Sequence, residues 1–259
     1  MPFRAIPVFL HRRFRHGFIY INMSKGIQKP TDLIGRKVGI QSFQVSANLW
    51  LRGILESEYG VPHKSIEWFA ELDEDIEFAP SADLKLSRLG PSDSIEDMLV
   101  RGELDVVMHS DVITPILNRD PRVGRLFPDY KKEEEKFYRK TGIFPIMHVM
   151  AIRGDVVEKY PWLPINMFRL FNEAKTYAMK RMENPRIVPL AWYREAWEEQ
   201  EEILGKDPWE YGLEGKNRTN LETLVRYSHQ QGLIGRQIPL EELFLNVFQG
   251  RKRFDEVRI

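Results

Sequence analysis

The feature that most constrains the fold is a short apolar segment, then a loop and an amphipathic helix, between residues 37 and 59. Lys37–Ile40 (KVGI) has the composition of a short buried strand. After a loop at residues 41–46, apolar residues recur at helical spacing, and Gly60 ends the pattern: Ala47, Trp50, Leu51, Ile54 and Leu55. A strand, a loop and a helix in this order predict an α/β fold rather than an all-helical one.

Short runs rich in β-branched and aromatic residues predict further strands at residues 5–10, 17–22, 66–69, 84–86, 104–109 and 144–152. Helical periodicity predicts helices at residues 94–101, 165–182, 189–204, 220–231 and 240–248, the first with Ser94 and Asp97 as a capping box. Strands therefore dominate the first 152 residues and helices the rest. We expect two lobes: residues 36–143 form one, and residues 1–35 and 144–259 form the other. The strands at 17–22 and 144–152 would cross between them.

Composition excludes several classes of protein. The 259-residue chain is 42% hydrophobic and 12% aromatic, as expected of an ordered globular protein. Lys+Arg and Asp+Glu both count 38, so no net charge draws it to nucleic acid. It has no cysteine, which excludes disulfides and thiolate ligands. No apolar run approaches the roughly 20 residues of a membrane helix.

Signature motifs for nucleotide binding, serine hydrolysis and zinc proteolysis are absent. The six histidines do not pair at metal-ligand spacing on any predicted helix, so we expect no metal site. A metal bound by histidines and aspartates that are distant in the sequence stays open as an alternative.

A basic turn is the densest polar feature. Five of the six residues at 11–16 (HRRFRH) are arginine or histidine, and they lie between two predicted strands. Arg13 and Arg15 could bind a carboxylate in two-point fashion, with His16 beside them. A solvated surface turn is the alternative, and strand alternation would divide the side chains between a cleft and water.

Two further polar segments follow predicted strands. The loop at 41–46 leads into a helix N-terminus, where backbone N–H groups and the helix dipole favour an anion. Its polar side chains Ser42, Gln44 and Ser46 add donors, although Ser46 alone could be a helix cap. His109, Ser110 and Asp111 end the strand at 104–109, at the edge where α/β sheets bind ligands.

His148 lies within the apolar strand at 144–152. A histidine in such a strand is either a core residue or, at a crossing between lobes, part of a cleft. The charge runs at 133–136 and 198–202 are typical of solvated helix faces.

Several longer segments resemble a known family. Residues 30–40 (PTDLIGRKVGI) and 102–109 (GELDVVMH) are similar to the second lobe of thiamine-precursor and alkanesulfonate substrate-binding proteins. A closer resemblance is to the 4,5-dihydroxyphthalate decarboxylase family. It rests on residues 6–22 (IPVFLHRRFRHGFIYIN), 50–61 (WLRGILESEYGV), 125–130 (RLFPDY), 138–153 (YRKTGIFPIMHVMAIR) and Pro161-Trp162.

The resemblance implies a type II periplasmic-binding-protein-like fold with two lobes joined by two crossing strands. A strand–helix–strand unit precedes the IPVF strand in that family, so we expect the first lobe to be incomplete here. The implied reaction converts 4,5-dihydroxyphthalate to a dihydroxybenzoate (protocatechuate) and CO2 without a cofactor. His148, His16 and His109, in that order, are then the candidate proton donors, and Arg13 and Arg15 would bind the second carboxylate.

A solute-binding protein that delivers a small organic anion to an ABC transporter is the alternative function, and only that alternative implies a permease partner. Otherwise we expect a small aromatic carboxylate as the ligand, no nucleic acid, no membrane insertion and a potential homo-oligomer. The N-terminus lacks the long apolar segment of a secretory signal. We therefore expect a cytoplasmic protein, or a periplasmic or lipid-anchored one if the alternative holds and the start is missing.

Overall fold

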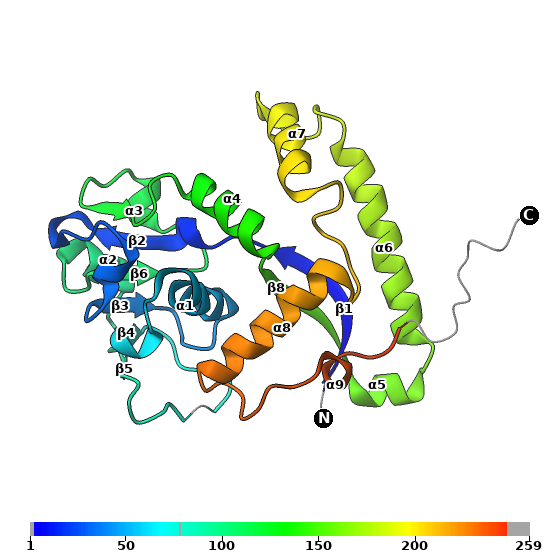
Figure 1. The fold of residues 1–259 in the computed structure, drawn as a ribbon, viewed down its shortest axis with the longest axis horizontal. Coiled ribbons are helices and arrows are strands. Elements are labelled where there is room, and N and C mark those ends of the chain that lie inside the picture. Colours follow the sequence, from blue (N-terminus) through cyan, green and yellow to red (C-terminus); the bar gives the residue numbers. More distant parts are fainter. Residues whose placement is uncertain (1–2, 78, 248–259) are drawn as a thin grey trace, which may run out of the picture. The chain divides into compact units, whose positions relative to one another are not determined.

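The computed structural model describes residues 3–77 and 79–247. These residues form two compact units. Unit 1 comprises residues 3–12, 146–222 and 238–247, and unit 2 comprises residues 13–145 and 223–237. The chain passes between the units four times, after residues 12, 145, 222 and 237 (Figure 1). Among the described residues, no helix is both long and apolar enough to cross a membrane.

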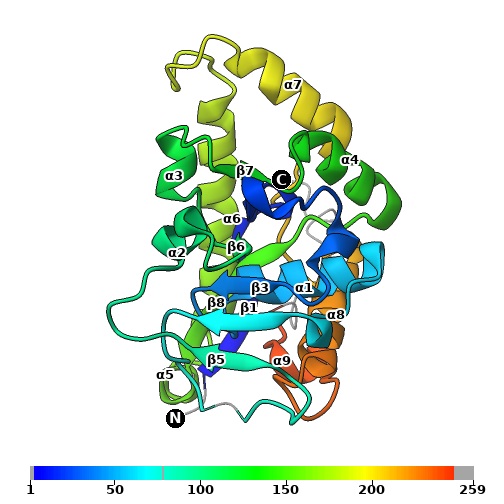
Figure 2. The ribbon, with the colours of Figure 1, turned by 90° about the vertical axis from the view of Figure 1, so that its left-hand side faces the viewer.

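Unit 2 is built on a six-stranded mixed sheet with the order β5-β4-β3-β6-β2-β7. The strands are β2 (Ile19–Asn22), β3 (Lys37–Ile40), β4 (Glu67–Ala70), β5 (Leu86–Arg88), β6 (Val106–Met108) and β7 (Val123–Arg125). The four strands β5, β4, β3 and β6 run parallel, and β2 runs antiparallel to both β6 and β7. Figure 2 shows β3, β4 and β5 side by side.

The apolar character of the central strands β3 and β6 follows from burial on both faces of the sheet. On one face, Val38, Ile40 and Met108 pack with residues of α1 (Ser46–Tyr59). On the other face, Val107 packs with residues of α2 (Ile95–Arg101). Gly39 allows the second face to pack closely, because a Cβ there would lie 2.7 Å from the Leu104 side chain.

The sequence explains the bounds of these helices. Gly60, at φ +67°, accommodates the left-handed turn that ends α1. The Ser94 side chain accepts a hydrogen bond from the Asp97 backbone N–H at the start of α2, which confirms half of the expected capping box. Unit 2 also contains α3 (Thr114–Leu117), α4 (Tyr130–Thr141) and the C-terminal part of α8 (Gly215–Gln230).

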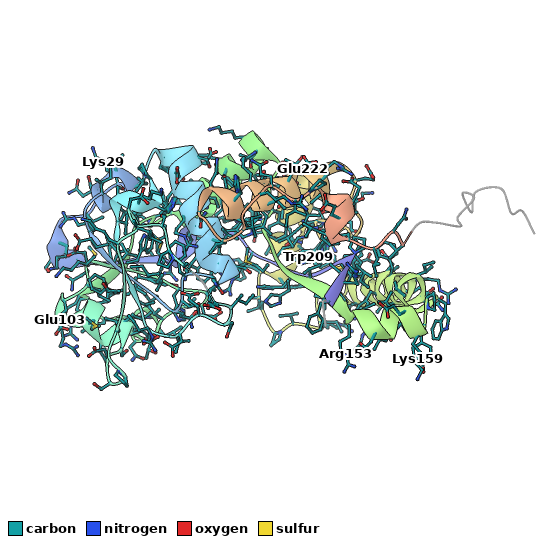
Figure 3. All side chains as sticks on the ribbon, turned by 90° about the horizontal axis from the view of Figure 1, so that it is seen from below. Lys29, Glu103, Arg153, Lys159, Trp209 and Glu222 are labelled. Carbon is teal, nitrogen blue, oxygen red and sulfur yellow. The ribbon has the colours of Figure 1, made fainter. Side chains whose placement is uncertain are left out.

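Unit 1 contains a two-stranded antiparallel sheet of β1 (Phe3–Arg12) and β8 (Ile146–Arg153). Its helices are α5 (Gly154–Lys159), α6 (Leu163–Met182), α7 (Tyr193–Leu204), the N-terminal part of α8, and α9 (Leu240–Leu243). Ile6, Val8, Ile152 and Phe168 form most of its core. Polar side chains follow the end of β8, where Arg153 and Lys159 extend away from the ribbon (Figure 3).

The structure confirms the α/β class and most of the expected elements, and it corrects one crossing strand and several element bounds. Residues 17–22 are not a crossing strand. Residues 16–18 form a 3-10 turn, and β2 lies inside the unit 2 sheet between β6 and β7. The chain instead enters unit 2 after residue 12, so residues 13–35 belong to that unit rather than to the first lobe.

The other corrections concern element bounds. The helix expected at 189–204 begins at Tyr193, and the helix expected at 220–231 begins at Gly215. The strand expected at 84–86 begins two residues later, as β5. The helix expected at 240–248 ends at Leu243. Residue 248, the end of the expected helix, lies outside the described residues.

The outer edge of β8 predicts self-association, because no strand pairs with it among the described residues. Val149 on β8 is 45% exposed. We expect Val149→Lys to reduce concentration-dependent association in light scattering while changing the free energy of unfolding by less than about 0.5 kcal/mol. Thr176→Lys, on the exposed face of α6, is the control for added charge. An equal reduction in both variants would contradict pairing through the β8 edge.

Candidate functional site

Three polar segments meet at one edge of the unit 2 sheet. The carboxyl ends of β3 and β6 share this edge because the two strands are parallel. The antiparallel strand β2 begins at the same edge, so the turn before it arrives there too. The Ser110 hydroxyl after β6 donates a hydrogen bond of 2.8 Å to the Gln41 side-chain oxygen after β3.

The basic turn brings two arginines to this edge. Arg13 contacts the Asp111 carboxylate at 3.1 Å, and its guanidinium lies 4.3 Å from the centre of the Phe18 ring. Arg15 is 3% exposed and donates to the Ser110 carbonyl at 2.9 Å. Burial, followed by the charge of Arg13, lowers the pKa of Arg15 to about 10, so it remains a cation at neutral pH. Arg13 is the more accessible donor for a ligand, and Arg15 holds the loop after β6.

His109 has a partner on its Nδ1 atom in both protonation states. The Asp111 backbone N–H donates to Nδ1 at 3.0 Å. An amide N–H can only donate, so this contact places the proton of the neutral ring on Nε2. In the imidazolium, Nδ1–H can donate to the Asp111 carbonyl oxygen, which lies 3.1 Å away. Asp111 therefore fixes the orientation of the His109 ring.

Two residues at this edge were not among the expected site residues. Tyr20 is fully buried on β2, and its hydroxyl donates to the Asp111 carbonyl at 3.0 Å. Burial raises the pKa of Tyr20 to about 12, so it stays protonated. Glu134 belongs to the charge run at 133–136, which we expected to be a solvated face. It instead accepts a hydrogen bond of 3.2 Å from the Gly17 backbone N–H.

The loop at 41–46 already binds a carboxylate, and that carboxylate is the protein's own. The backbone N–H groups of Phe43 and Gln44 donate to Glu74 at 2.5 and 2.8 Å. The Gln44 side-chain amide donates to the Ile76 carbonyl at 2.8 Å. Two backbone donors of this loop and the Gln44 side chain are therefore occupied from within the chain.

Ser42 and Ser46 both lie near the start of α1. Ser42 is buried, and its carbonyl accepts a hydrogen bond of 3.0 Å from the Asn48 side chain. Ser46 is the first residue of α1, and the N-cap position belongs to Val45, which makes no side-chain cap bond. Ser46 is therefore not the cap of α1.

His16 lies in an aromatic box away from the polar edge. Its ring centre is 5.4 Å from those of Phe127 and Phe137 and 6.1 Å from that of Tyr59. The side chain is 2% exposed, and neither ring nitrogen has a hydrogen-bond partner among the described residues. Burial lowers the pKa of His16 to about 4, so the ring is neutral at pH 7. These properties disfavour His16 as a proton donor.

His148 lies on β8 of unit 1, where it is exposed and its ring centre is 5.0 Å from that of His11. His16 and His109 both belong to unit 2, but only His109 lies beside Ser110 and Asp111 at the polar edge, because the ring of His16 is in the aromatic box. No group of three or more histidine, aspartate and glutamate side chains that could hold a metal ion occurs in residues 3–77 and 79–247.

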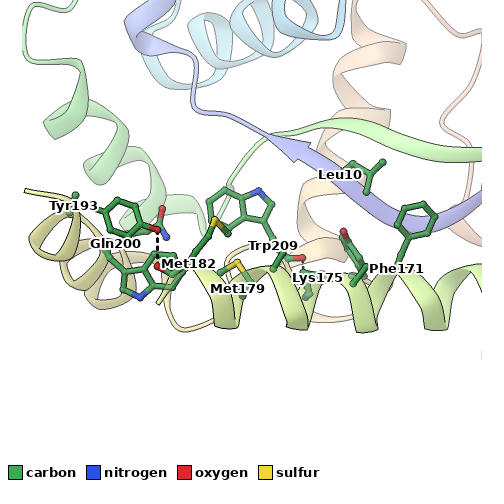
Figure 4. A pocket seen from close by; sticks show the side chains of 13 residues that line it. Leu10, Phe171, Lys175, Met179, Met182, Tyr193, Gln200 and Trp209 are labelled. Carbon is green, nitrogen blue, oxygen red and sulfur yellow. Dashed lines mark hydrogen bonds between the residues drawn. The ribbon is translucent and has the colours of Figure 1, made fainter. Parts of the chain in front are cut away.

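Unit 1 contains a separate apolar pocket of about 530 Å3 (Figure 4). Three small residues (Ala174, Ala178 and Ala196) leave the space, and larger side chains surround it: Leu10, Phe171, Lys175, Met179, Met182, Tyr193, Trp197, Gln200, Trp209 and Tyr211. Lys175 is its one charged lining residue among those described, and it already pairs with Asp207. None of the expected site residues lines this pocket, so the edge of unit 2 is the stronger candidate for anion chemistry.

The buried His16 predicts a pH-dependent loss of stability. A histidine whose folded pKa is lowered opposes folding as pH falls from about 6.5 towards about 4, because the unfolded chain binds the proton more tightly. Relative to His16→Phe, the wild type should lose about 2 kcal/mol of unfolding free energy between about pH 7 and about pH 5. Urea denaturation at both pH values measures this difference. Parallel stability curves for the two proteins would contradict a neutral buried His16.

Comparison with known proteins identifies the family of the chain. No family model matches the chain. It is 31% identical over 251 residues to 4,5-dihydroxyphthalate decarboxylase of Comamonas testosteroni, covering 94% of this chain and 76% of that protein. It is also 31% identical over 144 residues to 4,5-dihydroxyphthalate decarboxylase of Pseudomonas putida, covering 53% of this chain and 56% of that protein.

Two solved structures were also compared. The desulfurization enzyme DSZB is 11% identical, with a TM-score of 0.51 over 93% of this chain and 76% of that one. The periplasmic aliphatic sulphonate binding protein SsuA from Escherichia coli is 13% identical, with a TM-score of 0.40 over 97% of this chain and 73% of that one. The chain shares its α/β fold with DSZB, in agreement with the type II periplasmic-binding-protein-like class expected from the sequence. The chain belongs to the 4,5-dihydroxyphthalate decarboxylase family.

Proposed function

We propose that this protein is a non-oxidative aromatic decarboxylase that converts 4,5-dihydroxyphthalate to protocatechuate and CO2. The observation that carries the proposal is the 31% identity over 251 residues to a relative of that name. The edge of the unit 2 sheet supports it, because an accessible arginine and an oriented histidine lie there together.

The reaction needs a proton donor rather than an oxidant. Protonation of the ring carbon that bears the carboxylate interrupts aromaticity, and the phenol para to that carbon supplies electron density. The bond to the carboxylate then breaks, its electron pair restores the aromatic ring, and CO2 leaves. A site for this chemistry must hold the second carboxylate, present an acid to the ring carbon and exclude water.

Arg13 suits the role of binding the second carboxylate, and His109 suits the role of the acid. The Nε2 atom of His109 has no partner among the described residues, and Nδ1 keeps a partner on Asp111 whether the ring is neutral or charged. The imidazolium would donate its Nε2 proton to the ring carbon and regain a proton from solvent after CO2 leaves. Arg13 would bind the second carboxylate while Arg15 fixes Ser110 beside it.

Replacing Arg13 tests the carboxylate site. We expect Arg13→Ala to weaken the binding of phthalate by about 1.5–3 kcal/mol, because one charge-assisted hydrogen bond is lost. Isothermal titration calorimetry measures the change. Arg122→Ala is the matched control, since Arg122 precedes β7 at the opposite edge of the sheet and pairs with Asp120. Equal affinity in wild type and Arg13→Ala would return the basic turn to the solvated-surface interpretation.

Replacing His109 tests the proton donor. His109→Gln keeps a hydrogen-bonding side chain of similar reach but cannot act as an acid, so turnover should fall about 10²–10⁴-fold while affinity changes far less. CO2 release from 4,5-dihydroxyphthalate measures turnover, and His148→Gln is assayed beside it. Normal turnover in His109→Gln together with a loss in His148→Gln would transfer the role to His148.

A further inference from the structure

Glu134 lies where α4 packs against the basic turn. Its carboxylate accepts a hydrogen bond from the Gly17 backbone N–H at 3.2 Å and a second from the backbone N–H of His16. The Gly17 carbonyl accepts a hydrogen bond of 3.0 Å from Nε of Arg125. A Cβ at Gly17 would lie 2.9 Å from the ring of Tyr130, so the α4 side chains pack directly on the backbone of the turn. The segment that carries Arg13 and Arg15 is therefore held from both sides.

Opposing effects act on the pKa of the Glu134 carboxyl group. Burial disfavours its carboxylate, whereas the two backbone hydrogen bonds and the charges of Arg13 and Arg15 favour it. Burial prevails and raises the pKa of Glu134 to about 7. The other charged or titratable groups nearby are Glu133 on α4, Glu58 and Tyr59 on α1, Arg125 on β7, Asp111 after β6 and the neutral His16.

An anion bound at Arg13 would change this balance. A bound carboxylate adds negative charge beside the same two arginines, and like charge favours the protonated form of a carboxyl group. Protonation does not release the turn, because the carbonyl oxygen of a neutral carboxyl group still accepts a hydrogen bond from Gly17. Proton uptake at Glu134 therefore removes a repulsion without breaking a contact.

We propose that Glu134 is a specificity-determining residue that couples the binding of a carboxylate ligand at Arg13 to the uptake of a proton. The inference rests on the proposed function in one respect, the assignment of Arg13 as the carboxylate-binding group. This coupling makes the affinity of the site for anions higher below pH 7 than above it. Affinity should be constant at low pH and should fall as pH rises through the pKa of Glu134.

Calorimetric titration of the full chain with phthalate tests the coupling. Both carboxylates of phthalate are ionised above neutrality. Phthalate has no phenol groups, so it adds no titrating group of its own and does not undergo the phenol-assisted decarboxylation. Titration in two buffers of different ionisation enthalpy reports the number of protons taken up. We expect wild type to take up protons and to lose affinity as pH rises above about 7, by at most about tenfold per pH unit, until Glu134 is ionised in the complex as well.

Two variants separate Glu134 from its neighbours. Glu134→Gln imitates the protonated form, so its affinity should be high and independent of pH, with no proton uptake. Glu135→Gln makes the same change of charge one residue away on α4 and should behave like wild type. Equal proton uptake in wild type and Glu134→Gln, or none in wild type, would overturn the proposal.

A measurement on the unmodified protein covers the case in which Glu134→Gln does not fold. In a ¹³C NMR titration of labelled glutamate carboxyl groups, one group should titrate near neutrality and move upward when phthalate is bound. The absence of any carboxyl group titrating above about pH 6 would overturn the proposal. A different result would separate this proposal from the proposed function. If Arg13→Ala binds phthalate as tightly as wild type while proton uptake still requires Glu134, then Arg13 is not the carboxylate-binding group.

Discussion

The parallel pairing of β3 with β6 is the constraint on which the described site depends. It places the ends of two strands at one edge, and the antiparallel strand β2 brings the basic turn to that edge. No regular structure continues there, so backbone and side-chain polar groups of the three segments meet at this edge. The hydrogen bonds between Ser110 and Gln41 and between Arg15 and Ser110 join the three segments. A shift of one residue in the β3–β6 register would separate them.

Charge balance is the second constraint. The chain's own carboxylates occupy groups that could bind an anion: Asp111 contacts Arg13, and Glu74 contacts the amides of Phe43 and Gln44. Arg15 and Glu134 are both largely withdrawn from solvent, and each favours the charged form of the other. The edge is thus preorganised by internal pairs, and an incoming anion must compete with them. This competition explains why a carboxyl group that changes charge near neutrality has consequences for ligand binding.

Local patterns were sufficient to predict much of this edge. Lys37–Ile40 and the helical spacing after residue 46 predicted β3 and α1, and the run at 104–109 predicted β6. From these elements, His109 and Ser110 could be placed near the loop at 41–46. Arg13 and Arg15 were recognised by their density of charge alone.

The remainder depends on contacts between distant parts of the chain. Glu134 stands in a run of charged residues on a helix, and nothing in that run distinguishes the residue that turns towards Gly17. His16 was expected beside the arginines, but the 3-10 turn at residues 16–18 breaks strand alternation and directs its ring into the aromatic box. The crossing point was misplaced because β2 and a crossing strand have the same composition, and only its pairing with β6 and β7 shows where it belongs.

The most direct test of the decarboxylase assignment is the fate of the proton. The full chain is incubated with 4,5-dihydroxyphthalate in D2O, CO2 is collected, and the product is examined by NMR and mass spectrometry. Direct protonation of the ring predicts protocatechuate with a single deuterium ortho to the remaining carboxylate, one CO2 per product and no consumption of oxygen. Binding of 4,5-dihydroxyphthalate without release of CO2 would contradict the assignment and identify a protein that only binds its ligand.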